Sequence, residues 1–167
     1  MSATTTFFQR TLTQRSGVHA RDVMVKRVYT VTPDQRVYEA VNILLKRRIS
    51  GMPVVDNERR VVGVISERDG IQALMRAVHD RTPPSTVGDV MTPNPKTITA
   101  DTHLMTIAHR FLTDNIRRLP VVDAEGRLVG QVSRRDLLAG AMRIFDKAPN
   151  RDAAILYLSA LNRDRPV

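Results

Sequence analysis

Residues 63–69 read Gly-Val-Ile-Ser-Glu-Arg-Asp, and residues 130–136 read Gly-Gln-Val-Ser-Arg-Arg-Asp. In each copy an apolar segment typical of a strand is followed by Ser, two charged residues and Asp, and then by an apolar run typical of a helix. A Ser and an Asp three residues apart at a helix start bring a hydroxyl, a carboxylate and free backbone N–H groups together. Both copies of the stretch therefore present the same polar groups.

The repeated stretch belongs to a longer duplication. Residues 22–71 align without a gap on residues 89–138 at a constant offset of 67, and nineteen of the fifty pairs are identical. Unrelated sequences of average composition would match at about three positions. Because a unit of roughly 55 residues buries only a small core, we expect the two units to pack together.

Each unit has the same predicted order of elements. Residues 29–31 predict a short strand, and Thr32-Pro33-Asp34-Gln35 predicts a helix start with Thr as N-cap and Pro in the first turn. Apolar residues at helical spacing follow in both copies: Val37, Ala40, Val41, Leu44 and Leu45, and then Leu104, Ile107, Ala108, Phe111 and Leu112. Residues 52–56 and 61–65 predict a hairpin, and the last helix begins at the Ser of the repeated stretch. The predicted fold is α/β (α+β), with the order β-α-β-β-α occurring twice.

The remaining segments set the expected domain boundaries. We expect an N-terminal arm at residues 1–20, repeat 1 over residues 21–80, a linker with two prolines at residues 81–87, repeat 2 over residues 88–147 and a C-terminal helix at residues 149–165. The arm is Arg-containing and free of acidic residues, which also fits a short transit peptide. The apolar face of the last helix fits docking on its own domain or a dimer contact.

Composition limits the function. Lys and Arg number 26 against 17 Asp and Glu, so the formal net charge is +9. That charge favours an anionic partner such as nucleotide phosphates, nucleic acid or an acidic protein. The charges are scattered along the chain, which also fits a role in solubility alone.

Several other functional classes find no support. The chain has no cysteine, which excludes disulfides, thiolate catalysis and cysteine-ligated metals. No apolar run approaches the ~20 residues of a membrane helix, and the N-terminus lacks the apolar core of a secretory signal, so we expect a cytoplasmic protein. Motifs for a Ser nucleophile elbow, a Walker loop and a His-Glu-x-x-His metal site are absent, and the four histidines are dispersed, so we expect no enzymatic activity and no bound metal.

The whole pattern resembles the CBS domain pair known as the Bateman module. The resemblance covers residues 22 to about 146 and rests on a Val-Met start, a Pro-Val-Val-Asp strand and a Gly-x-x-Ser-x-x-Asp end in each copy. It implies two repeats packed about a pseudo-twofold axis, with two clefts between them for adenine ligands such as AMP, ADP, ATP, NAD-type dinucleotides or S-adenosylmethionine. It also implies a homodimeric, disc-like regulatory module. Because no catalytic or transport domain is fused to the repeats, we expect the regulated protein to be a separate chain.

The physical chemistry of the repeated stretch is compatible with such a ligand. Asp69 and Asp136 can accept hydrogen bonds from ribose hydroxyls, and Ser66 and Ser133 lie where a hydroxyl and a helix N-terminus would meet a phosphate. Arginine adds bidentate positive charge, and the resemblance assigns the adenine slot to the first strand and to the segment leading into the second. The expected ligand-binding residues are Thr30, Val31, Ser50, Gly51, Met52, Pro53, Ser66, Arg68 and Asp69 in repeat 1, and Thr97, Ile98, Arg117, Arg118, Leu119, Pro120, Ser133, Arg134, Arg135 and Asp136 in repeat 2.

The two copies differ at positions that bear on the ligand. Ser50-Gly51 aligns with Arg117-Arg118, and Glu67 aligns with Arg134. The second set is more basic. We therefore expect two inequivalent sites, of which the one reached by these arginines favours more highly phosphorylated ligands.

Two alternatives stay open. Ser-x-x-Asp before an apolar run is also a capping box, in which the side chains serve only the helix. The pair could then be a ligand-free interaction scaffold. A nucleic-acid-binding protein is favoured by the net charge but disfavoured by an aromatic content of only 4%.

Overall fold

The computed structural model describes residues 17–81, 85–114 and 116–147. The C-terminal helix expected at residues 149–165 and most of the expected arm lie outside these residues, as do residues 82–84 of the linker. The helices are α2 (Ala20–Val23), α3 (Val37–Arg47), α4 (Glu67–Asp80), α5 (Val87–Val90), α6 (Leu104–Thr113) and α7 (Arg134–Lys147), and the strands are β1 (Gly51–Val55), β2 (Val61–Ser66), β3 (Thr92–Pro93), β4 (Ile98–Thr99), β5 (Arg118–Val122) and β6 (Leu128–Ser133). In the described part of the chain, no helix is long and apolar enough to cross a membrane.

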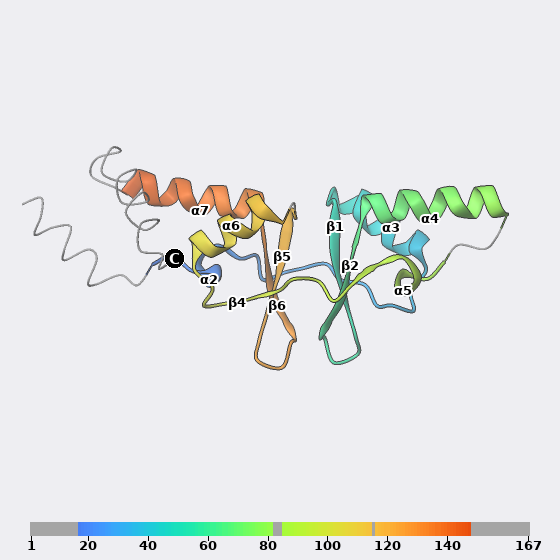
Figure 1. Cartoon of the computed structure of the whole chain (residues 1–167), viewed down its shortest axis with the longest axis horizontal. Helices are drawn as coiled ribbons and strands as arrows, with labels where there is room; N and C mark the ends of the chain where they lie inside the picture. Colours follow the sequence, from blue (N-terminus) through green and yellow to red (C-terminus); the bar gives the residue numbers. More distant parts are fainter. Residues whose placement is uncertain (1–16, 82–84, 115, 148–167) are drawn as a thin grey trace, which may run out of the picture.

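Each repeat is built on an antiparallel hairpin, as the sequence predicts. β1 pairs with β2 and β5 pairs with β6, in equivalent registers. The register shifts at Val54/Val55 in one hairpin and at Val121/Val122 in the other, so the irregularity is repeated too. The two hairpins lie side by side at the centre of the molecule, and the long helices α4 and α7 extend outward along one edge (Figure 1).

The first strand of the unit is shorter than predicted in repeat 1 and forms a regular pair in repeat 2. In repeat 2, β4 runs parallel to β5. In repeat 1 the strand predicted at residues 29–31 pairs only at Val31, which bridges to Val54. The Val31 N–H donates to the Pro53 carbonyl at 3.3 Å, and the Val55 N–H donates to the Val31 carbonyl at 2.9 Å.

The helix predicted to start at Thr32 starts at Val37, and this part of the prediction is wrong. Gln35 does face Thr32, but its Oε1 accepts the Thr32 N–H at 2.8 Å and so closes a turn. The Val37 N–H donates to the Ser85 carbonyl at 3.0 Å, and the Gln35 carbonyl accepts the Val87 N–H at 2.8 Å. Because a segment of the other repeat takes these backbone groups, they cannot form the first turn of a helix.

That other segment reveals an exchange between the repeats. We call residues 18–27 and 85–94 the leading segments of repeats 1 and 2. The leading segment of repeat 2 contains α5 and β3, and β3 extends the sheet of repeat 1 by pairing with β2. The leading segment of repeat 1 pairs through Val25 with Gln131 of β6, with N–H to carbonyl distances of 2.9 and 3.0 Å. Each leading segment therefore packs on the opposite repeat.

The two hydrophobic cores show the same exchange. In the core of repeat 2 the buried residues are Ala20, Val23, Ile98, Leu104, Ile107, Phe111, Leu119, Val121 and Val132. In the core of repeat 1 they are Val31, Ala40, Leu44, Met52, Val54, Ile65 and Val87. Ala20 and Val23 come from the leading segment of repeat 1, and Val87 comes from that of repeat 2. Neither half therefore has a complete core without its partner.

A histidine pair lies where the leading segment of repeat 1 docks. His19 and His103 form a β-bridge, and their rings meet edge to face with centroids 5.7 Å apart. Burial lowers the pKa of His103 from its usual value, and the charge of His19 lowers it further. His103 Nδ1 accepts the Met105 N–H at 3.2 Å and so caps α6, which is a structural role.

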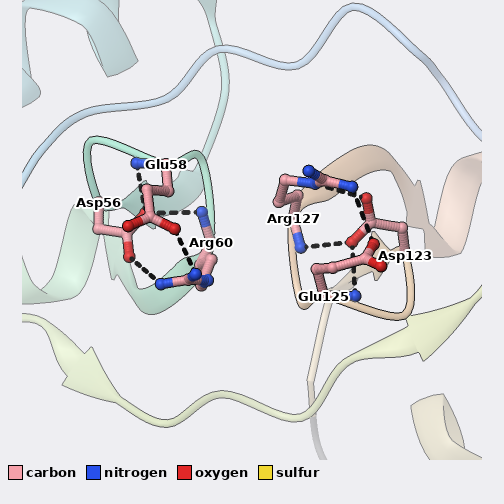
Figure 2. Close-up of polar contacts among 6 residues, drawn as sticks. All are labelled: Asp56, Glu58, Arg60, Asp123, Glu125 and Arg127. Atoms are coloured by element: carbon pink, nitrogen blue, oxygen red, sulfur yellow. Dashed lines mark hydrogen bonds and ion pairs between the residues drawn. The ribbon is translucent and has the colours of Figure 1, made fainter.

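The hairpin tips tie the repeats together at the end opposite the helices. The Val61 N–H donates to the Gly126 carbonyl at 3.1 Å, and the Leu128 N–H donates to the Arg59 carbonyl at 2.9 Å. Figure 2 shows the two turns facing each other, with Asp56 and Asp123 in equivalent places. Each of these carboxylates accepts two backbone N–H groups of its own turn, those of Glu58 and Arg60 in one and those of Glu125 and Arg127 in the other.

The last helix of each repeat begins at the Ser of the repeated stretch, as predicted. Ser66 caps α4, and Asp69 Oδ2 accepts the Ser66 N–H at 2.8 Å and the Ser66 hydroxyl at 2.7 Å. At α7, Asp136 Oδ2 accepts the Ser133 N–H at 2.8 Å and the Ser133 hydroxyl at 2.6 Å. Both copies therefore form a capping box.

The exchange makes a prediction for Gly140 of α7. A Cβ at this position would lie 2.3 Å from Val23 Cγ1, on the leading segment of repeat 1. Gly140→Ala should therefore lower the free energy of unfolding by about 1–3 kcal/mol, although Ala normally favours a helix. In urea unfolding, the double variant Gly140→Ala/Val23→Ala should lose less stability than the two single variants added together. Additive effects would place Val23 away from α7.

The capping boxes make a second prediction. Ser66→Ala and Ser133→Ala should each lower the free energy of unfolding by about 1 kcal/mol, because each removes the hydroxyl that accepts one N–H of the helix start, that of Asp69 or of Asp136. Ser66→Thr and Ser133→Thr retain the hydroxyl and should lower the free energy of unfolding by only a few tenths of a kcal/mol. Thermal unfolding followed by circular dichroism measures both. Equal effects of Ala and Thr would show that the hydroxyl does not cap.

Candidate functional site

Strand alternation assigns the polar ends of the hairpins to one face. Met52, Val54 and Ile65 are buried in the core of repeat 1, so their neighbours Gly51, Pro53, Val64 and Ser66 lie on the other face of the sheet. In repeat 2 the same alternation places four residues on the face away from the core: Arg118, Pro120, Gln131 and Ser133. Pro53 is fully buried although it lies away from the helices of its own repeat. We call these two surfaces the inter-repeat faces.

Backbone pairing brings the predicted site residues of each repeat together. In repeat 1, Gly51 pairs with Ser66, and the Glu67 N–H donates to the Ser50 carbonyl at 3.1 Å. The equivalent bond in repeat 2 runs from the Arg134 N–H to the Arg117 carbonyl at 3.1 Å. The segment leading into the second strand therefore lies against the start of the last helix.

The first-strand residues reach the same region from the other side. Val31 is buried and hydrogen-bonded to Pro53, and Ile98 is buried in the parallel pair with Val121. Thr30 and Thr97 precede these residues and are half-buried. Val31 thus contacts the predicted Pro53, and Ile98 pairs with the residue that follows the predicted Pro120.

Arg118 is the one predicted residue whose side chain is seen to cross between the repeats. Its Nη2 donates to Ser50 Oγ at 2.8 Å, and its Nη1 donates to the Gly51 carbonyl. Burial lowers the pKa of Arg118 and the charge of Arg117 adds to this, whereas the carboxylates of Glu67 and Asp136 act in the opposite direction. The guanidinium therefore lies near the repeated stretches of both halves.

The other predicted arginines lie differently. Arg134 donates from Nε to the Ile116 carbonyl at 2.9 Å and from Nη2 to the Phe111 carbonyl at 3.0 Å, so it ties α7 to the end of α6. Arg68, Arg117 and Arg135 are exposed. Among the predicted arginines, and within the described part of the chain, Arg118 alone hydrogen-bonds to a site segment of the other repeat.

The sequence did not single out Gln131. This residue lies on the inter-repeat face of β6, and its Oε1 is buried without a hydrogen-bond partner in the described part of the chain. Its counterpart in repeat 1 is Val64. An amide in a strand position that the other copy fills with an apolar residue is the signal that would have identified it, because buried amides need partners. Within the described residues, no three His, Asp or Glu side chains gather as a metal site.

Comparison with known proteins agrees with this architecture. The family model for the CBS domain matches residues 20–76 and 87–143. The chloroplastic CBS domain-containing protein CBSX1 of Arabidopsis thaliana is 30% identical over an alignment 175 positions long, gaps included, that covers 86% of this chain and 72% of the relative. Inosine-5'-monophosphate dehydrogenase of Methanocaldococcus jannaschii is 40% identical over 119 residues, but these residues cover 71% of this chain and only 23% of that enzyme.

Solved structures show the same fold. The crystal structure of CBSX2 in complex with AMP has a TM-score of 0.70 and 33% identity, and the match covers 77% of this chain and 98% of that one. The CBS domain pair of protein MJ0100, in complex with 5'-methylthioadenosine and S-adenosyl-L-methionine, has a TM-score of 0.65 and 30% identity over 73% of this chain and 98% of that one. Two matched domains, their arrangement and their order along the chain lead to one conclusion: this protein belongs to the CBS-domain family and is built around a tandem CBS pair.

Proposed function

We propose that this protein is a non-catalytic regulatory module that binds adenine nucleotides between its two CBS repeats and signals to a separate partner protein. The observation that carries the proposal is the meeting of the two repeated stretches around Arg118 on the inter-repeat faces. Two solved CBS pairs that are 30–33% identical to this chain are complexes with AMP or with 5'-methylthioadenosine and S-adenosyl-L-methionine. AMP, ADP, ATP and NAD-type ligands are the candidates.

The roles of the site residues follow from their chemistry. Asp69 and Asp136 are proposed to accept hydrogen bonds from ribose hydroxyls, using the oxygens that each capping box leaves available. Each capping box uses Oδ2 of its Asp, and Oδ1 has lone pairs that can take a ribose hydroxyl. The N–H groups of the first turns of α4 and α7 and the guanidinium of Arg118 are proposed to face phosphate. Gln131 Oε1 offers an acceptor for a ligand N–H.

The capping geometry also supports a second candidate function. Both Ser-x-x-Asp motifs already serve their own helices, and a scaffold that binds no small molecule would need nothing more. The two candidates differ in whether the protein is stabilised by adenine ligands.

A thermal-shift panel separates these candidates. AMP, ADP, ATP, NADH and S-adenosylmethionine at about 100 times the dissociation constant should stabilise the fold by about 2.7 kcal/mol. Asp69→Ala and Asp136→Ala should each lose part of the shift, and the double variant should lose all of it. Asp80→Ala, at the exposed far end of α4, is the charge-matched control and should keep the shift. If no adenine ligand moves the melting temperature, the scaffold is the better account.

A homodimer is proposed from the apolar surface of the helices. Exposed apolar residues occur in pairs that the 67-residue offset relates: Leu45 and Leu112, Ile71 and Leu138, and Met75 and Met142 are between 56% and 85% exposed. α4 and α7 lie along the same edge of the molecule (Figure 1), so this surface has the pseudo-twofold symmetry of the module. A self-complementary apolar surface of this kind suits a second copy of the chain.

Light scattering after gel filtration measures the dimer. The wild-type protein should have twice the mass of the 18.8 kDa chain, and the double variant Ile71→Glu/Leu138→Glu should be a monomer, because buried unpaired charges oppose association. Gln72→Glu, one position along α4 and also exposed, should remain a dimer. A monomeric wild type, or a dimer that survives the double variant, would contradict the proposal.

A further inference from the structure

Arg118 connects the two halves of the proposed binding region. Its backbone pairs with Ser133 of β6, the first residue of the capping box of α7. Its guanidinium reaches across to Ser50 and Gly51, and Gly51 pairs with Ser66, the cap of α4. One side chain thus spans from the repeated stretch of repeat 2 to that of repeat 1.

The other repeat has no equivalent side chain. Gly51 occupies the aligned position, and a Cβ there would lie 2.9 Å from the Ile65 carbonyl oxygen and 3.3 Å from Ser66 Cα. Both neighbours are backbone atoms, so the position has no room for a side chain without a backbone shift. The pseudo-twofold pair of sites is therefore served by one inter-repeat guanidinium where symmetry would supply two.

The charge of this guanidinium is only partly compensated. Both of its hydrogen bonds go to neutral oxygens, a hydroxyl and a carbonyl. Glu67 of repeat 1 and Asp136 of repeat 2 interact with it through their charges without a close ion pair. A half-buried arginine with neutral acceptors gains from a phosphate, because bidentate charge-assisted hydrogen bonds are stronger than bonds to neutral groups.

We propose that Arg118 is a single phosphate contact shared by both nucleotide sites, so that an anionic ligand in one site weakens the binding of an anionic ligand in the other. This inference rests on the proposed nucleotide-binding function. When the guanidinium binds a phosphate beside α4, it cannot bind a phosphate beside α7 at the same time. The same holds when it binds beside α7 first. Uncharged adenosine makes no such demand, so its two binding events are independent.

Isothermal titration of single-site variants tests the sharing directly. Asp136→Ala disables the site of repeat 2, so only the site of repeat 1 binds. Asp69→Ala disables the site of repeat 1, so only the site of repeat 2 binds. Adding Arg118→Met, which keeps an apolar stem of similar length, should weaken AMP binding about tenfold in both backgrounds, as expected for loss of a charge-assisted bond. Adenosine binding should not change. In the protein with both sites intact, the second AMP should bind about tenfold more weakly than AMP binds to the same site alone, and Arg118→Met should abolish this difference.

Controls separate the possible failures. Arg76→Ala removes an exposed charge on α4 and should leave both AMP affinities and their difference unchanged. Arg118→Lys keeps the charge without the fork, so it should weaken AMP less than Arg118→Met does, and melting curves show whether each variant is folded. An Arg118 effect in only one background, or two independent AMP sites in the wild type, overturns the sharing while the nucleotide-binding function stands. If no adenine ligand binds any of the proteins, both proposals fail.

Discussion

The first turns of α3 and α6 each donate a hydrogen bond to a segment from the opposite repeat. Val37 donates to the Ser85 carbonyl and Leu104 donates to the Val18 carbonyl, at 3.0 and 2.8 Å. These bonds fix the leading segments, which then complete the cores and, in repeat 1, the sheet. Because each half depends on residues supplied by the other, the two repeats form one cooperative structure.

The exchange also determines where the polar ends of the hairpins meet. The leading segments fasten the outer sides of the repeats, and the hairpin tips are joined by backbone hydrogen bonds at the centre (Figure 2). The inter-repeat faces are therefore held close together from both sides. Arg118 lies in this region and its guanidinium hydrogen-bonds to neutral oxygens, so a positive charge is already in position for the proposed phosphate contact.

The Ser and Asp that cap each helix are the same residues that are proposed to bind the ligand. A capped carboxylate is oriented before the ligand arrives, so binding costs less conformational entropy than it would with a free side chain. This accounts for the motif without choosing between a structural and a functional role. It also explains why the capping interpretation from sequence and the nucleotide-binding interpretation are compatible.

Local order was predictable from the sequence because neighbouring residues determine it. The hairpins, the apolar stripes of α3 and α6 and the capping boxes of α4 and α7 all follow from spacing within a few residues. The one wrong helix start, at Thr32, lies where backbone groups of residues 35 and 37 bond to residues 87 and 85, and no pattern local to Thr32 reveals a partner about fifty residues away.

The sequence by itself determined that the chain holds two copies of one β-α-β-β-α unit and that both copies carry the same Ser and Asp at a helix start. Only the tertiary structure decided which repeat each leading segment completes. It also decided that Arg118 reaches Ser50 and Gly51 of the other repeat, whereas Arg134 joins α7 to the end of α6 within its own repeat. The physical reason is that a duplicated sequence offers each segment two nearly equivalent docking surfaces, and long side chains several acceptors. The choice among them depends on packing and chain geometry across the whole molecule.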